Sequence, residues 1–197
     1  DGDGVVWELR PNHSKNPIEV VSNIHNIFSR QIIKNREFLK YKWLSGSCPS
    51  HYPVGGHIHF GINYRVNGNY SYLSELLDQY IGAISLLIED REEGLRRRGH
   101  EYGLASEYRS KKYGFEYRTC SSWITSPYVA AAMLCLAKTV MFEGLNNELF
   151  YSCNPRYVDE DSFRHMQTRK VRDIFPEIWS GITKMLLYQK YKLYIDL

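Results

Sequence analysis

Apolar and polar residues alternate along three short segments of the chain, which is the pattern of β-strands with one buried face. The first segment covers residues 5–10 and ends at Pro11, which has no amide hydrogen to donate to a neighbouring strand. The second and third cover residues 56–63 and 114–119. In each segment one side carries aliphatic or aromatic residues, and we expect that side to face the core.

Between these segments apolar residues recur every three or four positions, which predicts amphipathic helices. Asn16 and Pro17 favour a helix start, because asparagine caps free amides and proline suits the first turn. Ser126-Pro127 gives the same signal, and Gly99 is a typical helix stop. We therefore expect helices over residues 16–40, over residues 73–99, from residue 126 onward, and in the tail after residue 155.

The intervening segments are rich in glycine, proline and polar residues, which favours loops and turns. We expect loops over residues 45–54 and 103–113, a turn at residues 67–69 and a short strand at residues 41–44. Because strands and helices alternate irregularly, the predicted class is α+β, with helices packed on one face of a mainly antiparallel sheet. No repeat or linker divides the sequence, so residues 1–197 are expected to form a single domain.

The composition narrows the functional classes only slightly. The chain is 43% hydrophobic and 24% charged, and its net charge of +3 is far below the basic bias of a dedicated nucleic-acid-binding protein. The four cysteines form no C-x-x-C pair, which favours free thiols over a disulfide framework or a zinc knuckle. We find neither a signal peptide nor a run approaching about 20 apolar residues, and we predict a cytoplasmic protein without a membrane partner.

The polar sides of the three predicted strands carry an unusual set of residues. A solvent-facing strand ordinarily shows lysine, threonine, serine and glutamate on its polar side. Here that side offers two carboxylates, two imidazoles and two guanidiniums, namely Glu8, Arg10, His57, His59, Glu116 and Arg118. Carboxylates and imidazoles can hold Mg²⁺ or Mn²⁺, and guanidiniums bind phosphate oxygens through paired hydrogen bonds. The pattern therefore predicts a site for a metal ion and a polyphosphate.

Other basic and metal-binding residues leave alternatives open. The pair of His57 and His59 also suits zinc, although no cysteine accompanies it and the surroundings are rich in arginine. Arg109 and the lysines at 111 and 112 either reach over a bound nucleotide or acidic substrate, or form a solvated basic loop. The three arginines at residues 96–98 are interpreted as structural, because cations suit the C-terminal end of a helix.

Three motifs stand in a definite order along the chain. The first is Asp3-Gly4 followed by Glu8-Leu9-Arg10-Pro11, the second is Gly55-Gly56-His57-Ile58-His59-Phe60-Gly61, and the third is Gly114-Phe115-Glu116-Tyr117-Arg118. Their order and spacing resemble the phage-type carboxylate–amine ligases (COOH-NH2 ligase type 2), an amidoligase branch of the glutamine synthetase and glutamate–cysteine ligase superfamily. The resemblance covers about residues 1–145.

The resemblance implies a curved antiparallel sheet like the glutamine synthetase catalytic domain, with ATP and divalent cations on its concave face. It also implies ATP-dependent formation of an amide or peptide bond through an acyl phosphate, with Mg²⁺ or Mn²⁺. The implied metal ligands are Glu8, His57 and Glu116. The implied nucleotide contacts are His59, Arg10, Arg109 and Arg118, with Glu116 and Arg118 closest to the transferring phosphoryl group.

The family pattern further implies an earlier strand with another acidic metal ligand. The sequence begins at Asp1, so we expect that strand upstream if the chain is a fragment, and a metal site short of one carboxylate if it is complete. The expected substrates are small-molecule or peptide carboxylates and amines. An unpaired edge strand would also allow a homo-oligomer.

Two other functions stay open at this point. A non-catalytic nucleic-acid or protein-binding module would use the tyrosines and basic residues but leaves the paired acids and histidines without a role. The second is a metal-dependent hydrolase or oxygenase that uses His57 and His59 in the manner of a cupin. A cupin is a β-barrel, for which the predicted helix content is too high.

Overall fold

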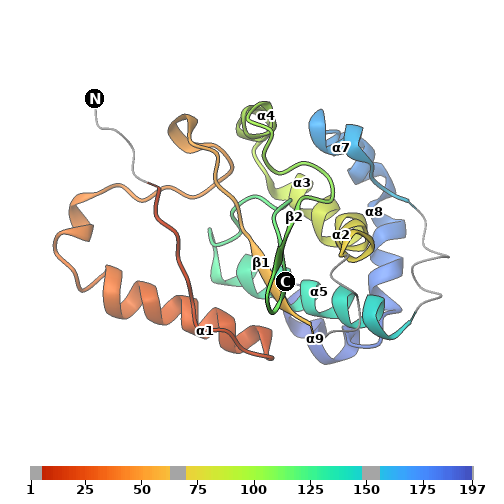
Figure 1. Ribbon diagram of the computed structural model, residues 1–197, viewed down its shortest axis with the longest axis horizontal. Helices are drawn as coiled ribbons and strands as arrows, with labels where there is room; N and C mark the ends of the chain where they lie inside the picture. Colours follow the sequence, from red (N-terminus) through yellow and green to blue (C-terminus); the bar gives the residue numbers. More distant parts are fainter. Residues whose placement is uncertain (1–5, 63–69, 148–155, 197) are drawn as a thin grey trace.

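The computed structural model describes residues 6–62, 70–147 and 156–196. The turn predicted at residues 67–69 lies outside those residues, as do the first residue of the segment 5–10 and the last residue of the segment 56–63. In Figure 1 the strands lie near the centre of the molecule, with helices α2, α3 and α8 to one side of them and α1 to the other.

Helix α1 (Pro17–Ile27) begins where the sequence predicts. The Asn16 side chain accepts a hydrogen bond from the amide of Ile18 at 3.1 Å. The helix continues as a single π-helical segment, η1 (Phe28–Ile32), and then ends, so the predicted extension to residue 40 is too long. The side chain of Asn35 accepts from the amide of Glu37 at 3.0 Å, a local bond that favours a turn over helix. A separate 3₁₀ turn, η2 (Phe38–Lys40), follows.

The helix predicted over residues 73–99 is divided. Its first part runs through α2 (Ser71–Leu77), η4 (Asp78–Gly82) and α3 (Ala83–Ile88). The backbone of Glu89 is then extended, and α4 (Arg91–Gly99) begins afresh with Asp90 accepting from the amide of Glu93 at 2.9 Å. The break arises because Asp90 is a strong cap and because the buried Glu89 carboxylate pairs with Arg98 at 2.8 Å. The apolar periodicity did not reveal this break.

The sheet has three antiparallel strands in the order β1-β3-β2. Strands β1 (Ile58–Gly61) and β3 (Gly114–Tyr117) lie within the predicted segments, whereas β2 (Tyr108–Lys111) lies in a stretch predicted to be a loop. The tight approach of β1 to β3 explains one glycine, because a Cβ at Gly114 would come within 2.0 Å of the Phe60 carbonyl oxygen.

Two predicted strands are wrong. Residues 6–10 and 41–44 adopt no strand, because neither segment pairs with another part of the chain that the structure describes. Instead Trp7 packs against Phe38 and Trp43, with ring centroids 5.0 and 6.0 Å away. The alternation in residues 6–10 therefore reflects an aromatic contact on one side and polar residues on the other, without a ladder of backbone hydrogen bonds.

The core lies against the apolar face of the sheet. Phe115 stacks on Phe60 and on Tyr70, with centroids 5.2 and 5.0 Å apart. Behind these rings, α5 (Pro127–Asn146) packs against α1, α2 and α9 (Tyr188–Ile195), while α8 (Thr168–Thr183) packs against α3 and the short α7 (Glu160–Arg164) contacts α4. The predicted α+β class is confirmed, whereas the likeness to glutamine synthetase and the curvature of the sheet stay predictions.

Helix α5 begins at Pro127 with Ser126 as its cap, as predicted. It is 20 residues long and apolar enough, by length and composition, to cross a membrane, contrary to the expectation that the sequence holds no such stretch. However, 67% of its apolar window is buried among the other helices, as in the core helix of a globular domain.

The cysteines in the described part of the chain are free. Cys48, Cys120 and Cys135 are buried and unpaired, as predicted, and Cys153 lies outside the described residues. Burial raises the pKa of the Cys120 and Cys135 thiols to about 12, so neither is a thiolate nucleophile at neutral pH.

Candidate active site

Three of the predicted site residues form one row across the sheet. His59 of β1 and Arg109 of β2 stand directly opposite Glu116 of the central strand β3. Directly opposed residues in antiparallel strands point to the same face, so these side chains share the polar face of the sheet. Lys111, two residues after Arg109, lies on that face too, opposite Gly114, which has no side chain to cover it. The register therefore places a basic strand beside the acid.

Glu116 is the centre of this arrangement. Its carboxylate is buried and lies within ion-pair distance of four side chains: His57 Nδ1 at 3.0 Å, Lys111 Nζ at 2.7 Å, Arg118 Nε at 3.4 Å and Arg109 Nη1 at 3.9 Å. Burial acts to raise the pKa of Glu116, but the hydrogen bond from Lys111 and the nearby positive charges outweigh it and lower the pKa. The group is therefore an anion at neutral pH.

His57, immediately before β1, is a neutral imidazole. Burial lowers its pKa to about 4, against the opposing effect of the Glu116 charge. Its Nδ1 faces Glu116, and its Nε2 is hydrogen-bonded to the hydroxyl of Tyr102. Both ring nitrogens thus have a polar partner, which fixes the plane of the ring.

Arg118 follows the end of β3 and is held on several sides. Its guanidinium pairs with Glu107 at 2.8 Å and lies over the ring of Tyr102, 4.9 Å from the centroid. Its backbone amide also donates to the Glu107 carbonyl at 2.8 Å. Arg118 is only 18% exposed, so its charge is presented from a nearly fixed position.

Glu8 and Arg10 lie close to the row without joining it. Their side chains are exposed and form an ion pair with each other at 2.7 Å. The hydrogen bond from Arg10 lowers the pKa of Glu8, and the charges of His57 and Glu116 also act on it. Burial lowers the pKa of His59, on which the charges of Glu8 and Arg10 act as well. The pair of Glu8 and Arg10 is therefore a neighbour of the sheet face rather than part of a further strand.

The predicted metal ligands do not converge as a set of three. Within the described ranges, no three His, Cys, Asp or Glu side chains are arranged to hold one metal ion. His57 Nδ1 and Glu116 Oε1 are nevertheless 3.0 Å apart, close to the roughly 3 Å between adjacent ligands of an octahedral ion with bonds of about 2.1 Å. Two donors at this spacing suit Mg²⁺, which keeps waters and phosphate oxygens as its other ligands. A catalytic zinc site needs three protein ligands and fits less well.

Several residues around the site were not predicted as part of it. Tyr102 and Glu107 hold Arg118, and the hydroxyl of Tyr113 lies 2.5 Å from His59 Nδ1. They lie in or beside a polar stretch without periodicity, so no pattern in the sequence indicates their contacts. The structural interpretation is confirmed for two of the three arginines at residues 96–98, for a different reason: Arg97 and Arg98 are buried, and Arg97 donates to backbone carbonyls beyond β3. Arg96 is exposed.

A buried acid supports the sheet from its core side. Asp78 of η4 accepts hydrogen bonds from the hydroxyls of Tyr117 and Ser106, at 2.5 and 3.0 Å. Burial raises the pKa of Asp78 to about 7, although these hydrogen bonds act to lower it. Because Tyr117 is next to Glu116 in β3, the ionisation of Asp78 acts directly beneath the candidate site.

This raised pKa predicts a pH dependence of stability. The folded state holds the Asp78 proton up to about pH 7, whereas the unfolded chain releases it near its ordinary pKa of 3.8. Stability should therefore fall as pH rises from about 4 to about 7, at up to roughly 1.4 kcal/mol per pH unit from this group. Urea unfolding of the wild type and of Asp78→Asn across this range measures the effect as the difference between them. Parallel stability curves would show that Asp78 has an ordinary pKa.

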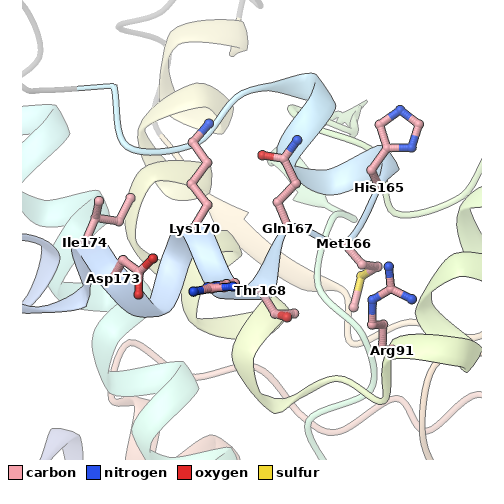
Figure 2. A pocket seen from close by; sticks show the side chains of 9 residues that line it. Arg91, His165, Met166, Gln167, Thr168, Lys170, Asp173 and Ile174 are labelled. Carbon is pink, nitrogen blue, oxygen red and sulfur yellow. The ribbon is translucent and has the colours of Figure 1, made fainter.

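A separate pocket of about 600 Å³ lies where the N-terminal end of α8 approaches Arg91 of α4 (Figure 2). Basic and polar side chains line it, among them Gln167, Arg169 and Lys170. The Lys170 ammonium is engaged by the hydroxyl of Ser162 at 2.9 Å. None of the side chains on the polar face of the sheet belongs to this lining, so the pocket is distinct from the candidate active site.

The chain matches the family described as phage phiEco32-like COOH-NH2 ligase-type 2 over residues 2–197. No curated protein and no solved structure matches it. The family match extends past the three motifs and includes the C-terminal helices α7, α8 and α9. Because the match spans nearly the whole chain, the resemblance indicated by the motifs is confirmed: the protein belongs to this family of carboxylate–amine ligases.

Proposed function

We propose that the protein is an ATP-dependent, Mg²⁺-dependent ligase that joins a carboxylate to an amine through an acyl phosphate. The observation that carries the proposal is the environment of Glu116, a buried carboxylate at the centre of the sheet that faces a neutral His57 and three cations. One oxygen of Glu116 has the ring nitrogen of His57 at metal-ligand spacing, while the other has Lys111. A site of this kind serves a divalent cation and the phosphates that the cation accompanies.

The chemistry requires two transfers. The substrate carboxylate attacks the γ-phosphorus of ATP and ADP leaves; the amine then attacks the acyl carbon, expels phosphate and loses a proton. Phosphoryl transfer depends chiefly on positioning and on neutralising the phosphate oxygens. In the proposed roles Arg118, Arg109 and Lys111 supply this positive charge, Arg10 adds a second phosphate contact, and His59 lies beside the nucleotide phosphates.

The metal would be held by Glu116 and His57, with Glu8 as a neighbouring carboxylate. Mg²⁺ or Mn²⁺ bound there supplies Lewis-acid charge to the phosphate oxygens. Glu8 contributes a direct ligand only if its side chain leaves Arg10, to which it is paired. The neighbours of Glu116 and Arg118 hold both side chains in fixed positions. These side chains therefore need little reorganisation during phosphoryl transfer. We place the reaction in the cytoplasm, with small-molecule or peptide substrates.

Binding of ATP with Mg²⁺ should raise the melting temperature of the wild-type protein. At about one hundred times Kd the gain is roughly 2.7 kcal/mol, which corresponds to about 5 °C or more for a chain of this size. Arg109→Gln should reduce the shift, because it removes an exposed cation on the polar face of the sheet. Differential scanning fluorimetry measures the melting temperature with ATP and Mg²⁺, with ADP and Mg²⁺, and with Mg²⁺ alone.

Lys15→Gln provides the matched control, since Lys15 is an exposed cation outside the sheet and should leave the shift unchanged. Equal melting temperatures with and without ATP and Mg²⁺ in the wild type would contradict the proposal.

A further inference from the structure

Tyr102 contacts two of the groups assigned to the site, although it belongs to none of the three motifs. Its hydroxyl is hydrogen-bonded to His57 Nε2, and its ring lies under the guanidinium of Arg118. We propose that Tyr102 is a positioning residue whose hydroxyl lets His57 change tautomer when a divalent cation binds and whose ring holds Arg118 in place. The inference rests on the proposed function for the identity of the cation and of the phosphate.

The first step concerns the single ring hydrogen of neutral His57. Without a cation, Nδ1 at 3.0 Å from Glu116 Oε1 is best placed to carry the hydrogen and donate it to the carboxylate. Nε2 then has a lone pair and accepts from the Tyr102 hydroxyl. All three groups are satisfied in this arrangement.

The second step concerns the state in which His57 and Glu116 would hold a cation. Nδ1 would then give its lone pair to the cation, so its hydrogen would leave to solvent while Nε2 takes one up, and the ring would stay neutral. The Tyr102 hydroxyl rotates and accepts from Nε2–H, because a hydroxyl is both donor and acceptor. A carboxylate or carbonyl at this position could only accept, and would favour the second state alone. Partners on the far nitrogen of a ligating histidine commonly tune metal affinity.

The third step concerns the ring of Tyr102. The guanidinium carbons of Arg97 and Arg118 lie 4.8 and 4.9 Å from its centroid. The backbone directly after Tyr102 lies close to Arg97. Gly103 has a φ of +76°, and a Cβ at this residue would come within 1.9 Å of Arg97 Nη1. The amide of Gly103 also donates at 2.6 Å to Glu107, which pairs with Arg118. These contacts therefore fix the position of the Tyr102 ring against the guanidinium of Arg118.

The two parts of Tyr102 can be separated by substitution. Tyr102→Phe removes the hydroxyl and keeps the ring, so Mg²⁺ affinity should fall by about 10- to 100-fold while kcat at saturating Mg²⁺ stays close to wild type. Tyr102→Leu removes both, so kcat should also fall, by about 10-fold or more. Tyr128→Phe, which alters an exposed hydroxyl on α5, is the matched control and should change neither value.

Histidine ¹H–¹⁵N correlation spectra provide a readout that does not depend on turnover. The His57 signals, assigned with His57→Gln, should show the Nδ1–H tautomer without Mg²⁺ and the Nε2–H tautomer with Mg²⁺ alone. The same His57 tautomer with and without saturating Mg²⁺, or wild-type Mg²⁺ affinity in Tyr102→Phe, would overturn the inference. Because nucleotide is absent from this experiment, its failure is distinct from a failure of ATP to stabilise the protein, which would overturn the proposed function.

Discussion

Glu116→Gln is expected to lower the kcat of amide formation by about 10²- to 10³-fold, the usual size of the loss when one fixed charge at a transferring group is removed. Glutamine keeps the shape of the side chain but not the charge that faces His57, Lys111 and Arg118. It also removes a carboxylate oxygen at metal-ligand spacing from His57 Nδ1. Stabilisation by ATP with Mg²⁺ should be lost together with turnover.

The effect of Glu116→Gln is measured by phosphate release with a candidate carboxylate and amine, and by melting temperature with and without ATP and Mg²⁺. Glu37→Gln is the matched control, because Glu37 is an exposed carboxylate that pairs with Lys40 at the surface. It should change neither quantity. A Glu116→Gln protein that retains wild-type kcat would exclude Glu116 from the reaction.

The strands that could be predicted from the sequence are those whose alternation is tied to the core. Ile58 and Phe60 in β1, and Phe115 and Tyr117 in β3, alternate with polar residues because one face packs against the helices. Strand β2 escaped prediction because Arg109, Ser110 and Lys111 are consecutive polar residues. Its pairing with β3 is a property of the hairpin rather than of local hydrophobicity. Residues 6–10 show the reverse case, an alternating segment that pairs with no strand among the described residues.

The residues of the candidate site also divide into those whose positions could be predicted from the sequence and those whose positions could not. His59 and Glu116 were predicted to share a face, and the register confirms this and adds Arg109, which had been placed on a loop. Glu8 was expected on a neighbouring strand and instead lies on a coil segment beside Arg10. The hydrogen bond between Tyr102 and His57 joins residues 45 positions apart in sequence, and such a contact leaves no periodic signal. Pattern therefore predicts the face, while the positions of its supporting residues depend on the tertiary structure.

The second large effect is expected from Arg97, which supports the chain behind the polar face of the sheet. Arg97 of α4 is fully buried, and its guanidinium donates to the backbone carbonyls of Arg118, Thr119 and Cys120 at 2.8–3.1 Å. It also lies 3.8 Å from the buried carboxylate of Glu89. One side chain thus satisfies three consecutive carbonyls directly after the strand that carries Glu116, a task that no shorter or less branched cation can perform.

Arg97→Met should accordingly destabilise the protein by about 3–5 kcal/mol, because the guanidinium is removed from all three carbonyls and Glu89 loses one of its two cations. The carbonyl of Cys120 still accepts from the amide of Gly56. Methionine keeps most of the apolar stem, so the loss measures the guanidinium rather than packing. Arg96→Met, the exposed neighbour on the same helix, should change stability by less than about 0.5 kcal/mol. Urea unfolding followed by circular dichroism measures both variants. Equal stability of Arg97→Met and Arg96→Met would mean that the chain after β3 holds its position without Arg97. Other residues would then have to hold Tyr102 and Arg118 in place.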